Sequence, residues 1–337
     1  MNMKQTGPFR ALAAVLAVAA LSSCSSGGAV VIAQPSVALP PLLPAGAALV
    51  DPVALGDSTG DSCQPPLPLR PYEGNHDPIP GGRLDRILAR GRLVVGLDQG
   101  TYPFSYRDTA TGEMKGFDVA MAREIAQGML GDPGRVEYRI ISSAGRAAAL
   151  ENDTVDLVIK TMSITCERAK EVTFSEPYFE TDQRVMAATN ANATTLADRK
   201  ILGESTVCAA RGTTSIAQFH HQFPTAKILG TTTWADCLVA MQQGSVDAIT
   251  SDESILYGFY DQDPNLYFLS ALQLGRQVYG IGMHKGEEEL PRVVNGIIEK
   301  VKGNGDWADM CRNNLKFSPC NRPPATPQYA AEGPTAP

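Results

Sequence analysis

The sequence lacks the features that mark a membrane-spanning, metal-binding or nucleotide-binding chain. Its apolar run near the N-terminus covers only residues 11–21, whereas a helix needs about 20 apolar residues to cross a bilayer. It has no CxxC pair and no cluster of cysteines with histidines, the usual ligands of structural zinc. No glycine-rich phosphate loop accompanies its polar segment at 160–179. We therefore predict no metal, no cofactor and no transmembrane helix.

Basic residues are scarce relative to acidic ones. The chain has 29 Lys and Arg against 36 Asp and Glu, a formal net charge of -7. An acidic surface repels polyanions, so nucleic acid and anionic lipid are poor partners. We expect no nucleic acid partner, and a monomer is the default oligomeric state.

The first residues have the pattern of a lipoprotein signal peptide. Lys4 and Arg10 precede the apolar run, and "LSSC" at 21–24 places small residues before a cysteine. We predict that residues 1–23 are removed and that lipid on Cys24 holds the protein at the extracytoplasmic face of the cell membrane. In the alternative, an ordinary secretory signal, Cys24 has no role.

The segments that flank the predicted domain differ from it in composition. Residues 24–80 are dense in Pro, Gly and Ala and show neither helical nor strand periodicity. Such a segment buries too little apolar surface to offset the entropy of ordering, which predicts an extended tether. Residues 321–337 are predicted to be a disordered tail.

Seven cysteines leave six for pairing if Cys24 carries lipid. In an oxidising compartment this number favours three disulfides, and several pairings are formally possible. The pairings that we favour are Cys208–Cys237, Cys311–Cys320 and Cys63–Cys166, the last of which joins the tether to the segment at 160–179.

From about residue 84 to residue 320, short apolar segments alternate with amphipathic ones. Phe117, Met121, Ile125 and Met129 recur at helical spacing on one face, which predicts a helix. The predicted strands are "RLVVGL" (92–97), "VEYRII" (136–141), "VDLVIK" (155–160), "KILGE" (200–204) and "VDAIT" (246–250). This alternation is typical of an α/β fold with largely parallel sheets.

Two segments of the chain echo each other. "ALENDTVDLVI" (149–159) and "AMQQGSVDAIT" (240–250) align without a gap as a helix end, a polar turn, Val-Asp and a strand. Ligands of open α/β sheets bind beyond the carboxyl ends of strands. If the two halves face each other, Arg168 and Asp252 therefore lie across one cleft. In the alternative, the echo reflects only a common way of joining a helix to a strand.

The residues after these strands suit an α-amino acid. The Arg168 guanidinium can bind a carboxylate through two N–H groups, and Ser163 and Thr165 add hydroxyl donors. Asp252 offers a carboxylate to an ammonium group. The plainer alternatives are that Arg168 is a surface charge and that Asp252 caps the following helix.

These segments resemble the bacterial extracellular solute-binding proteins of family 3, the type II amino-acid receptors of ABC importers. The resemblance covers about two thirds of the chain and includes the glutamate- and glutamine-binding lipoproteins of actinobacteria, in which paired cysteines at positions like Cys208 and Cys237 recur. The matching blocks are "LVVGLDQGTYPFSYRD", "GEMKGFDVAMAREIA", "VDLVIKTMSITCERAKEVTFSEPYF", "RGTTS", "GSVDAITSDESILYGF", "YGIGMHKG" and "VKGNGDWADMCRNNL". Cys166 departs from the family, which favours its pairing with Cys63.

The resemblance implies a two-lobed type II periplasmic-binding-protein fold in which two hinge strands join the lobes. Each lobe is expected to be a mixed, mostly parallel sheet flanked by helices. The expected bounds are 84–184 with 278–320 for lobe one and 185–277 for lobe two, with hinge strands at 183–189 and 276–282.

The resemblance also implies roles for individual residues. Arg168, with Ser163 and backbone N–H groups near Thr213 and Thr214, is expected to bind the α-carboxylate, while Asp252 binds the α-ammonium. The other residues expected to contact the ligand are Thr161 through its carbonyl, Tyr102 and Phe104 as pocket walls, and Asp98, Lys160 and Arg146 near the ligand side chain.

The specificity signals conflict. Arg146 occupies the position from which relatives direct an arginine to a distal carboxylate, whereas a carboxylate at Asp98 would repel an acidic side chain unless a cation such as Lys160 neutralises it. We expect a site for Asp, Glu and their amides, with acidic ligands favoured.

Three classes of function share this architecture. We expect a receptor that delivers an amino acid to an ABC permease and that catalyses no reaction. The alternatives are a sensor that presents ligand occupancy to a membrane signalling protein and a dehydratase-like enzyme. For catalysis Asp98, Glu180 and Glu253 are candidates, but none lies in a recognisable catalytic motif.

Overall fold

The computed structural model describes residues 43–51, 63–74, 76–188, 199–269, 272–317, 320 and 322–331. The predicted signal peptide and Cys24 lie outside these ranges, so lipidation stays a prediction. No helix within the described ranges is both long enough and apolar enough to traverse a bilayer.

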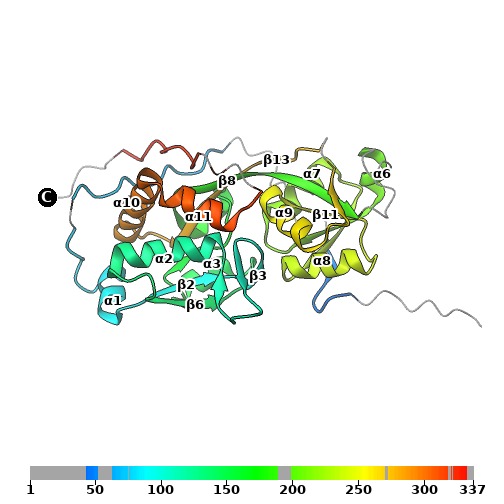
Figure 1. The fold of residues 1–337 in the computed structure, drawn as a ribbon. Coiled ribbons are helices and arrows are strands. Elements are labelled where there is room, and N and C mark those ends of the chain that lie inside the picture. Colours follow the sequence, from blue (N-terminus) through cyan, green and yellow to red (C-terminus); the bar gives the residue numbers. More distant parts are fainter. Residues whose placement is uncertain are drawn as a thin grey trace, which may run out of the picture. The chain divides into compact units, whose positions relative to one another are not determined.

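Two lobes share one continuous sheet (Figure 1), whose strand order is β1-β10-β9-β11-β8-β13-β7-β2-β6, with β12 also paired to β8. Within each lobe the inner strands are parallel, because β2 pairs in parallel with β6 and β7, and β9 with β10 and β11. Helices α1 to α9 lie between strands in the sequence, and α10 and α11 follow the last strand. The predicted fold class is therefore confirmed.

Lobe one contains the helices and strands before the first hinge strand and those after the second. They are α1 (Arg83–Arg90), β2 (Leu93–Leu97), β3 (Gly100–Thr101), β4 (Ser105–Arg107), β5 (Met114–Lys115), α2 (Phe117–Leu130), β6 (Val136–Ile140), α3 (Arg146–Glu151), β7 (Leu157–Val158), α4 (Cys166–Glu171), α10 (Glu289–Asn304) and α11 (Asp306–Asn314).

Lobe two contains the elements between the hinge strands, together with one strand from the N-terminal segment. They are β1 (Ala48–Leu49), α6 (Arg199–Glu204), β9 (Thr206–Ala210), α7 (Thr214–Gln222), β10 (Lys227–Thr231), α8 (Trp234–Gln242), β11 (Ala248–Asp252), α9 (Glu253–Gln262) and β12 (Leu266–Phe268).

The hinge strands are β8 (Val172–Ala188) and β13 (Gly275–His284), and β8 is longer than the hinge strand expected at 183–189. From Val172 to Gln183, β8 pairs antiparallel with β13, and from Gln183 onward it pairs with β11. The change of partner falls close to the expected lobe boundary, although the boundaries themselves stay predictions.

The helix predicted from residue 117 is α2, whose Phe117, Met121 and Ile125 are fully buried. Four of the five predicted strands contain observed strands, but the prediction of a strand at "KILGE" is wrong, because this segment is helix α6. A short apolar run does not distinguish the two structures by periodicity. Here Leu202 is fully buried and its neighbour Ile201 is 36% exposed.

The sequence echo corresponds to a repeated local structure. In lobe one, Asp156 donates its N–H to Val94 O and accepts the Val94 N–H through Oδ2, at 2.8 and 2.7 Å. In lobe two, Asp247 makes the same pair of bonds with Thr206, both at 2.8 Å. The Val-Asp dipeptide therefore fixes β7 against the start of β2, and β11 against the start of β9.

Parts of the predicted tether and tail contact the lobes. β1 pairs antiparallel with β10, Asn295 Nδ2 donates to Leu69 O at 2.6 Å, and Ala330 N donates to Pro68 O at 2.9 Å. The Tyr329 hydroxyl lies within hydrogen-bond distance of the carboxylates of Glu176 and Glu299 in lobe one. Composition does not indicate these contacts, because backbone carbonyls and one tyrosine make them rather than a periodic apolar face.

The structure contains disulfides at the three favoured pairings. Cys63–Cys166 closes a sequence separation of 103 residues, Cys208–Cys237 one of 29 and Cys311–Cys320 one of 9. The second joins β9 to α8 inside lobe two, and the third closes the end of α11.

Candidate functional site

A small cavity is enclosed by residues of both lobes. Its volume is about 10 Å³, roughly the space of one water molecule, so an amino acid enters only when the lobes or their side chains move. The lining residues are Arg146, Thr161, Ser163 and Arg168 from lobe one, and Thr213, Thr214, Trp234, Asp252 and Ile255 from lobe two.

Arg168 is held by the N-terminal turn of α4. Thr165 Oγ1 caps this helix by accepting the Arg168 N–H at 3.2 Å. The guanidinium donates to Ser163 O at 2.8 Å and to Gly212 O at 3.0 Å. Burial lowers the pKa of Arg168 to about 10, while the charge of Asp252 opposes this shift. The group stays protonated at neutral pH and, with five N–H donors, keeps capacity for an anionic ligand.

Arg146 is the first residue of α3 and only 3% exposed. Its guanidinium donates to Ser143 O at 2.8 Å, to Lys160 O at 3.1 Å and to Gly212 O at 2.9 Å. Burial, and then the nearby charge of Arg168, lower the pKa of Arg146. Its hydrogen-bond partners are carbonyl groups rather than carboxylates, and a buried cation in that position favours an anionic ligand group.

Gly212 is the point at which the two guanidiniums meet the other lobe. Its carbonyl accepts from both Arg146 and Arg168. The residue has a φ of 73°, and a Cβ there would lie 2.5 Å from the Cα of Ala144 in lobe one. A glycine is therefore required both by the backbone conformation and by the close approach of the lobes.

Asp252 ends β11 and is 5% exposed. Its Oδ2 accepts the hydroxyl of Tyr279, and its Oδ1 has no partner in the structure. It makes no side-chain cap to α9, so the alternative role as an N-cap is not observed. Burial raises the pKa of Asp252 to about 6, against the effects of the Tyr279 hydroxyl and of Arg168. The arrangement suits a ligand cation that would satisfy Oδ1.

Thr161 lines the cavity in a left-handed backbone conformation, with a φ of 39°. This conformation is strained for a β-branched residue. Asp118 Oδ2 accepts the Thr161 N–H at 3.0 Å, and Asp118 Oδ1 accepts the Tyr178 hydroxyl at 2.8 Å. The buried carboxylate thus holds Thr161 beside the cavity.

The hydroxyl residues differ in how their side chains are used. Ser163 Oγ lies 3.4 Å from Thr214 Oγ1, and Thr214 donates to Gln277 Oε1 at 2.9 Å. Thr213 donates to Ala210 O at 2.7 Å and precedes α7. Thr213 and Thr214 thus place the start of α7 at the cavity, and the first N–H groups of a helix can bind anions.

Asp98 and Lys160 are paired with each other and do not line the cavity. Asp98 also accepts from Thr101 Oγ1 at 2.9 Å and from Gln99 N at 2.7 Å. Burial alone would raise the pKa of Asp98, but Lys160 and these donors outweigh burial and leave it lowered. The expected neutralisation of Asp98 by Lys160 is present, and it removes the conflict with an acidic ligand.

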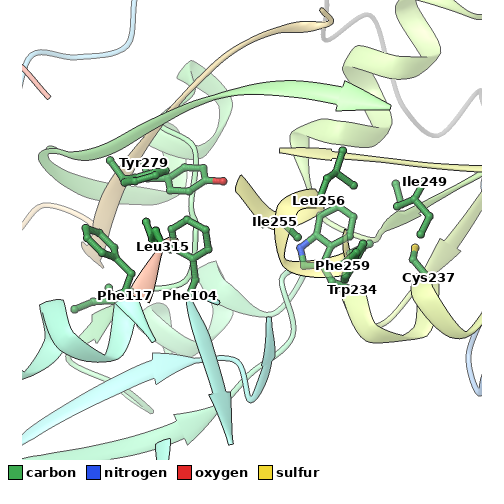
Figure 2. Close-up of a cluster of buried hydrophobic side chains, with 14 of the residues drawn as sticks. Phe104, Phe117, Trp234, Cys237, Ile249, Ile255, Leu256, Phe259, Tyr279 and Leu315 are labelled. Carbon is green, nitrogen blue, oxygen red and sulfur yellow. The ribbon is translucent and has the colours of Figure 1, made fainter. Parts of the chain in front are cut away.

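Tyr102 and Phe104 do not line the cavity either. Phe104 is fully buried among aromatic rings in lobe one, beside Phe117 and Tyr279 (Figure 2). The Tyr102 hydroxyl donates to Asp261 in lobe two at 2.6 Å. In this structure Phe104 belongs to the core and Tyr102 to a contact between the lobes. Their expected role as pocket walls around a ligand stays a prediction.

Trp234, Ile255 and Tyr279 were missed by the sequence reasoning. Trp234 opens α8 directly after the N-cap Thr233, which forms a capping box with Asp236, and it is 2% exposed. A capping motif just beyond a strand end would have indicated it. Tyr279 gave no such signal, because its contact with Asp252 depends on how the hinge strand lies against lobe two.

A larger cavity, of about 480 Å³, lies along the hinge strands. Its walls include Glu180, Arg276 and Glu253. Glu180 and Arg276 form an ion pair, and Glu253 lies 3.6 Å from Arg184. The smaller cavity instead combines the guanidiniums of Arg146 and Arg168 with the carboxylate of Asp252, which is the charge arrangement of a site for a zwitterion.

Comparison with known proteins identifies the family. The model of the bacterial extracellular solute-binding proteins, family 3, matches residues 93–316. The chain is 32% identical to the ABC transporter glutamine-binding protein of Bacillus subtilis, over 70% of this chain and 85% of that protein. It is 28% identical to a glutamate-binding protein of Corynebacterium efficiens, over 70% and 82% of the two chains.

The similar solved structures include an ancestral amino acid-binding protein described as a precursor of cyclohexadienyl dehydratase. The TM-score is 0.64, with 28% identity over 69% of this chain and 100% of that one. The fold and the paired lobes thus define a type II binding protein. The chain belongs to the bacterial extracellular solute-binding proteins, family 3.

Proposed function

We propose that this protein is a lipid-anchored extracytoplasmic receptor that binds an α-amino acid between its lobes and delivers it to an ABC importer. The observation that carries the proposal is the unpartnered Oδ1 of Asp252 in a cavity that also contains the guanidinium of Arg168. Arg168 would bind the α-carboxylate, with the N–H groups at the start of α7, and Asp252 would bind the α-ammonium.

The charge of the cavity favours an acidic amino acid. Arg146 and Arg168 contribute two positive charges and Asp252 one negative charge, whereas Asp98 is neutralised by Lys160 outside the lining. The resulting single positive charge is balanced by Asp or Glu but not by their neutral amides. Named relatives that bind glutamine and glutamate support the same range of ligands.

A receptor is a better proposal than an enzyme. Of the three carboxylates considered for catalysis, none lines the cavity: Asp98 pairs with Lys160, Glu180 with Arg276, and Glu253 lies near Arg184. An acid–base group must reach the reacting atoms. Delivery to a permease and presentation to a sensor use the same ligand-bound form, so a pull-down of the membrane partner distinguishes them.

The proposal is tested by a thermal-shift screen of the purified full chain against all proteinogenic amino acids. A ligand that binds only the folded protein raises its melting temperature. We expect the largest shifts with Asp and Glu, smaller ones with Asn and Gln, and none with large apolar amino acids. No shift with any amino acid would reject the proposal.

The role of Arg168 is tested by calorimetry on Arg168→Ala. We expect a loss of about 2–5 kcal/mol in binding free energy for every ligand, because the ligand α-carboxylate would be buried without its cation. Arg276→Ala, which removes an exposed cation outside the cavity lining, is the matched control. Unchanged affinity of Arg168→Ala would remove this residue from the site.

A further inference from the structure

The later described part of the tether, residues 63–74 and 76–80, forms what we call the N-terminal strap. It is fixed along α10 of lobe one: Asn295 Nδ2 donates to Leu69 O at 2.6 Å, and Arg292 Nη1 donates to Arg70 O at 2.9 Å. Near its other end, Glu289 Oε1 accepts the Ile79 N–H at 2.7 Å. Asn295 is fully buried and also accepts the N–H of Glu176 in β8 at 2.7 Å. The strap is therefore anchored to the body of lobe one.

The first residue of the strap is joined covalently to the helix that carries Arg168. Cys63 forms a disulfide with Cys166. Cys166 is the first residue of α4, directly after the cap Thr165 and two residues before Arg168. The bond thus connects the anchored strap to the same helical turn from which Arg168 reaches the cavity.

Helix α4 is short and makes few contacts of its own with the core. It has only six residues, and an isolated helix of this length is unstable in water. Its core contact is Ala169, which is 8% exposed, and Lys285 donates to the Ala169 carbonyl. Glu167 and Lys170, on the remaining face, are exposed. Directly before the helix, Ile164 N donates to Val278 O of β13 at 2.8 Å. At the N-terminal turn itself the helix is held by the Thr165 cap and by the disulfide.

We propose that the Cys63–Cys166 disulfide positions Arg168 for the α-carboxylate of the ligand, in addition to cross-linking the chain. The inference rests on the proposed function, because it concerns the geometry of the same binding site. With the disulfide present, the first turn of α4 is fixed between the strap and β8, and the guanidinium is directed at Gly212 O and the cavity. Without it, this turn can shift, and a small displacement of a carboxylate-binding group weakens binding strongly.

A cross-link that acted only on the unfolded chain would lower stability when removed but leave the affinity of the folded protein unchanged. Affinity therefore distinguishes the two roles. The Cys311–Cys320 disulfide is the matched control, because it also belongs to lobe one and neither cysteine lines the cavity.

The experiment is calorimetry with glutamate on the wild-type full chain, on Cys63→Ser/Cys166→Ser and on Cys311→Ser/Cys320→Ser. We expect the first double variant to bind about tenfold more weakly and the control within about twofold of the wild type, although both have lower melting temperatures. In an Arg168→Lys background, removing Cys63–Cys166 should weaken binding less than about twofold further, because groups that act together are not additive.

A second measurement applies if the serine variant fails to fold. Cys63 is exposed, whereas Cys208, Cys237 and Cys311 are fully buried, so a dilute dithiol should reduce Cys63–Cys166 first and be oxidised to its own disulfide. Affinity should then fall about tenfold while circular dichroism is unchanged, and reoxidation should restore it.

Two results would overturn the inference while leaving the receptor intact. One is unchanged affinity after loss of Cys63–Cys166, whether by substitution or by reduction. The other is an equal loss in the Cys311–Cys320 control, which would indicate general loosening of lobe one. Absence of amino-acid binding by the wild-type protein would instead overturn the proposed function and, with it, the inference.

Discussion

Arg146 and Arg168 share the carbonyl of Gly212 but have different surroundings. Arg168 is partly exposed and lies on a short helix, whereas Arg146 is buried and bonded to carbonyls of its own lobe. Both guanidiniums donate to carbonyl groups rather than to carboxylates, but Arg146 is only 3% exposed and makes two of its bonds to lobe-one carbonyls, so it is the more deeply buried cation. We therefore propose that Arg146 selects the ligand side chain and that Arg168 binds the common α-carboxylate.

Replacing Arg146 by Ala should change selectivity as well as affinity. The variant loses the charge that balances an acidic side chain, so affinity for Asp and Glu should fall at least about tenfold more than affinity for Asn and Gln. Calorimetry with the four amino acids measures this difference. Arg168→Ala is the control, because it should weaken all four to a similar extent. Equal losses in Arg146→Ala would contradict the assignment.

The raised pKa of Asp252 predicts weaker binding in acid. Only the ionised carboxylate attracts an ammonium group, and with a pKa of about 6 the ionised fraction falls to about a tenth at pH 5. Affinity for glutamate should drop about tenfold between pH 7.5 and pH 5. For the unliganded protein the sign is opposite: the fold favours protonated Asp252, so this group stabilises the folded state as the pH falls from about 6 to 4.

Asp118 could cause the same pH dependence of binding, because burial raises its pKa to about 6 as well. Asp252→Asn separates the two groups. This variant should bind weakly at both pH values and lose the contribution of Asp252, so its pH dependence should be much flatter. A wild-type pH dependence that persists in Asp252→Asn would point to Asp118, which holds the Thr161 N–H.

At the scale of elements, the same dipeptide supports a strand in each lobe in different surroundings. Asp156 is 6% exposed and also pairs with Arg90, whereas Asp247 is exposed. Each carboxylate accepts a backbone N–H from the neighbouring parallel strand. In both copies of the repeat the aspartate therefore attaches one strand to the next. The free energy of folding that each hydrogen bond contributes depends on how deeply the aspartate is buried.

Removing the aspartate of each Val-Asp dipeptide should destabilise the protein by different amounts. Asp156→Ala should lower the free energy of unfolding by about 2–3 kcal/mol, because it leaves a buried N–H group and Arg90 without their partner, and Asp247→Ala by about 1 kcal/mol or less. Urea unfolding measures both, with exposed Asp77→Ala as the control. Equal losses for the two variants would show that burial does not set the difference.

At the scale of the whole molecule, the two terminal segments stabilise lobe one together. Ala330 donates to Pro68 O, and the Arg70 guanidinium lies 5.5 Å from the centre of the Tyr329 ring. The Tyr329 hydroxyl reaches the carboxylates of Glu176 and Glu299. Glu176 is fully buried and forms an ion pair with Lys302. The described part of the predicted tail therefore completes a polar network of the core.

Tyr329→Phe tests this contribution. The change removes the hydroxyl that donates to a carboxylate and should lower the free energy of unfolding by about 1–2 kcal/mol. Urea unfolding measures the loss, with Tyr260→Phe, an exposed tyrosine of α9, as the control. No loss would mean that the segment contributes little to the fold.

The local pattern of apolar residues was sufficient to predict many of the helices and strands. The helix at Phe117–Leu130 follows from apolar residues that recur at its period, and β2, β6, β7 and β11 follow from short apolar runs. The strand predicted at 200–204 failed because two apolar residues in a short run fit either structure. Arg168 and Asp252 could be found because strand ends place the following residues at one edge of a sheet.

By itself, the sequence determined the α/β fold class and the two charged residues expected to face each other, because these follow from periodicity and from motifs within short segments. The two-lobed form and the preference for Cys63–Cys166 came from the resemblance to the family, and six cysteines alone left several pairings open. Tertiary structure alone decided that Arg146 and Arg168 meet at Gly212 O, that Tyr279 binds Asp252, and that Asp98 is neutralised outside the cavity. These contacts join residues far apart in the chain. Their geometry depends on how the two lobes pack, which no local spacing encodes.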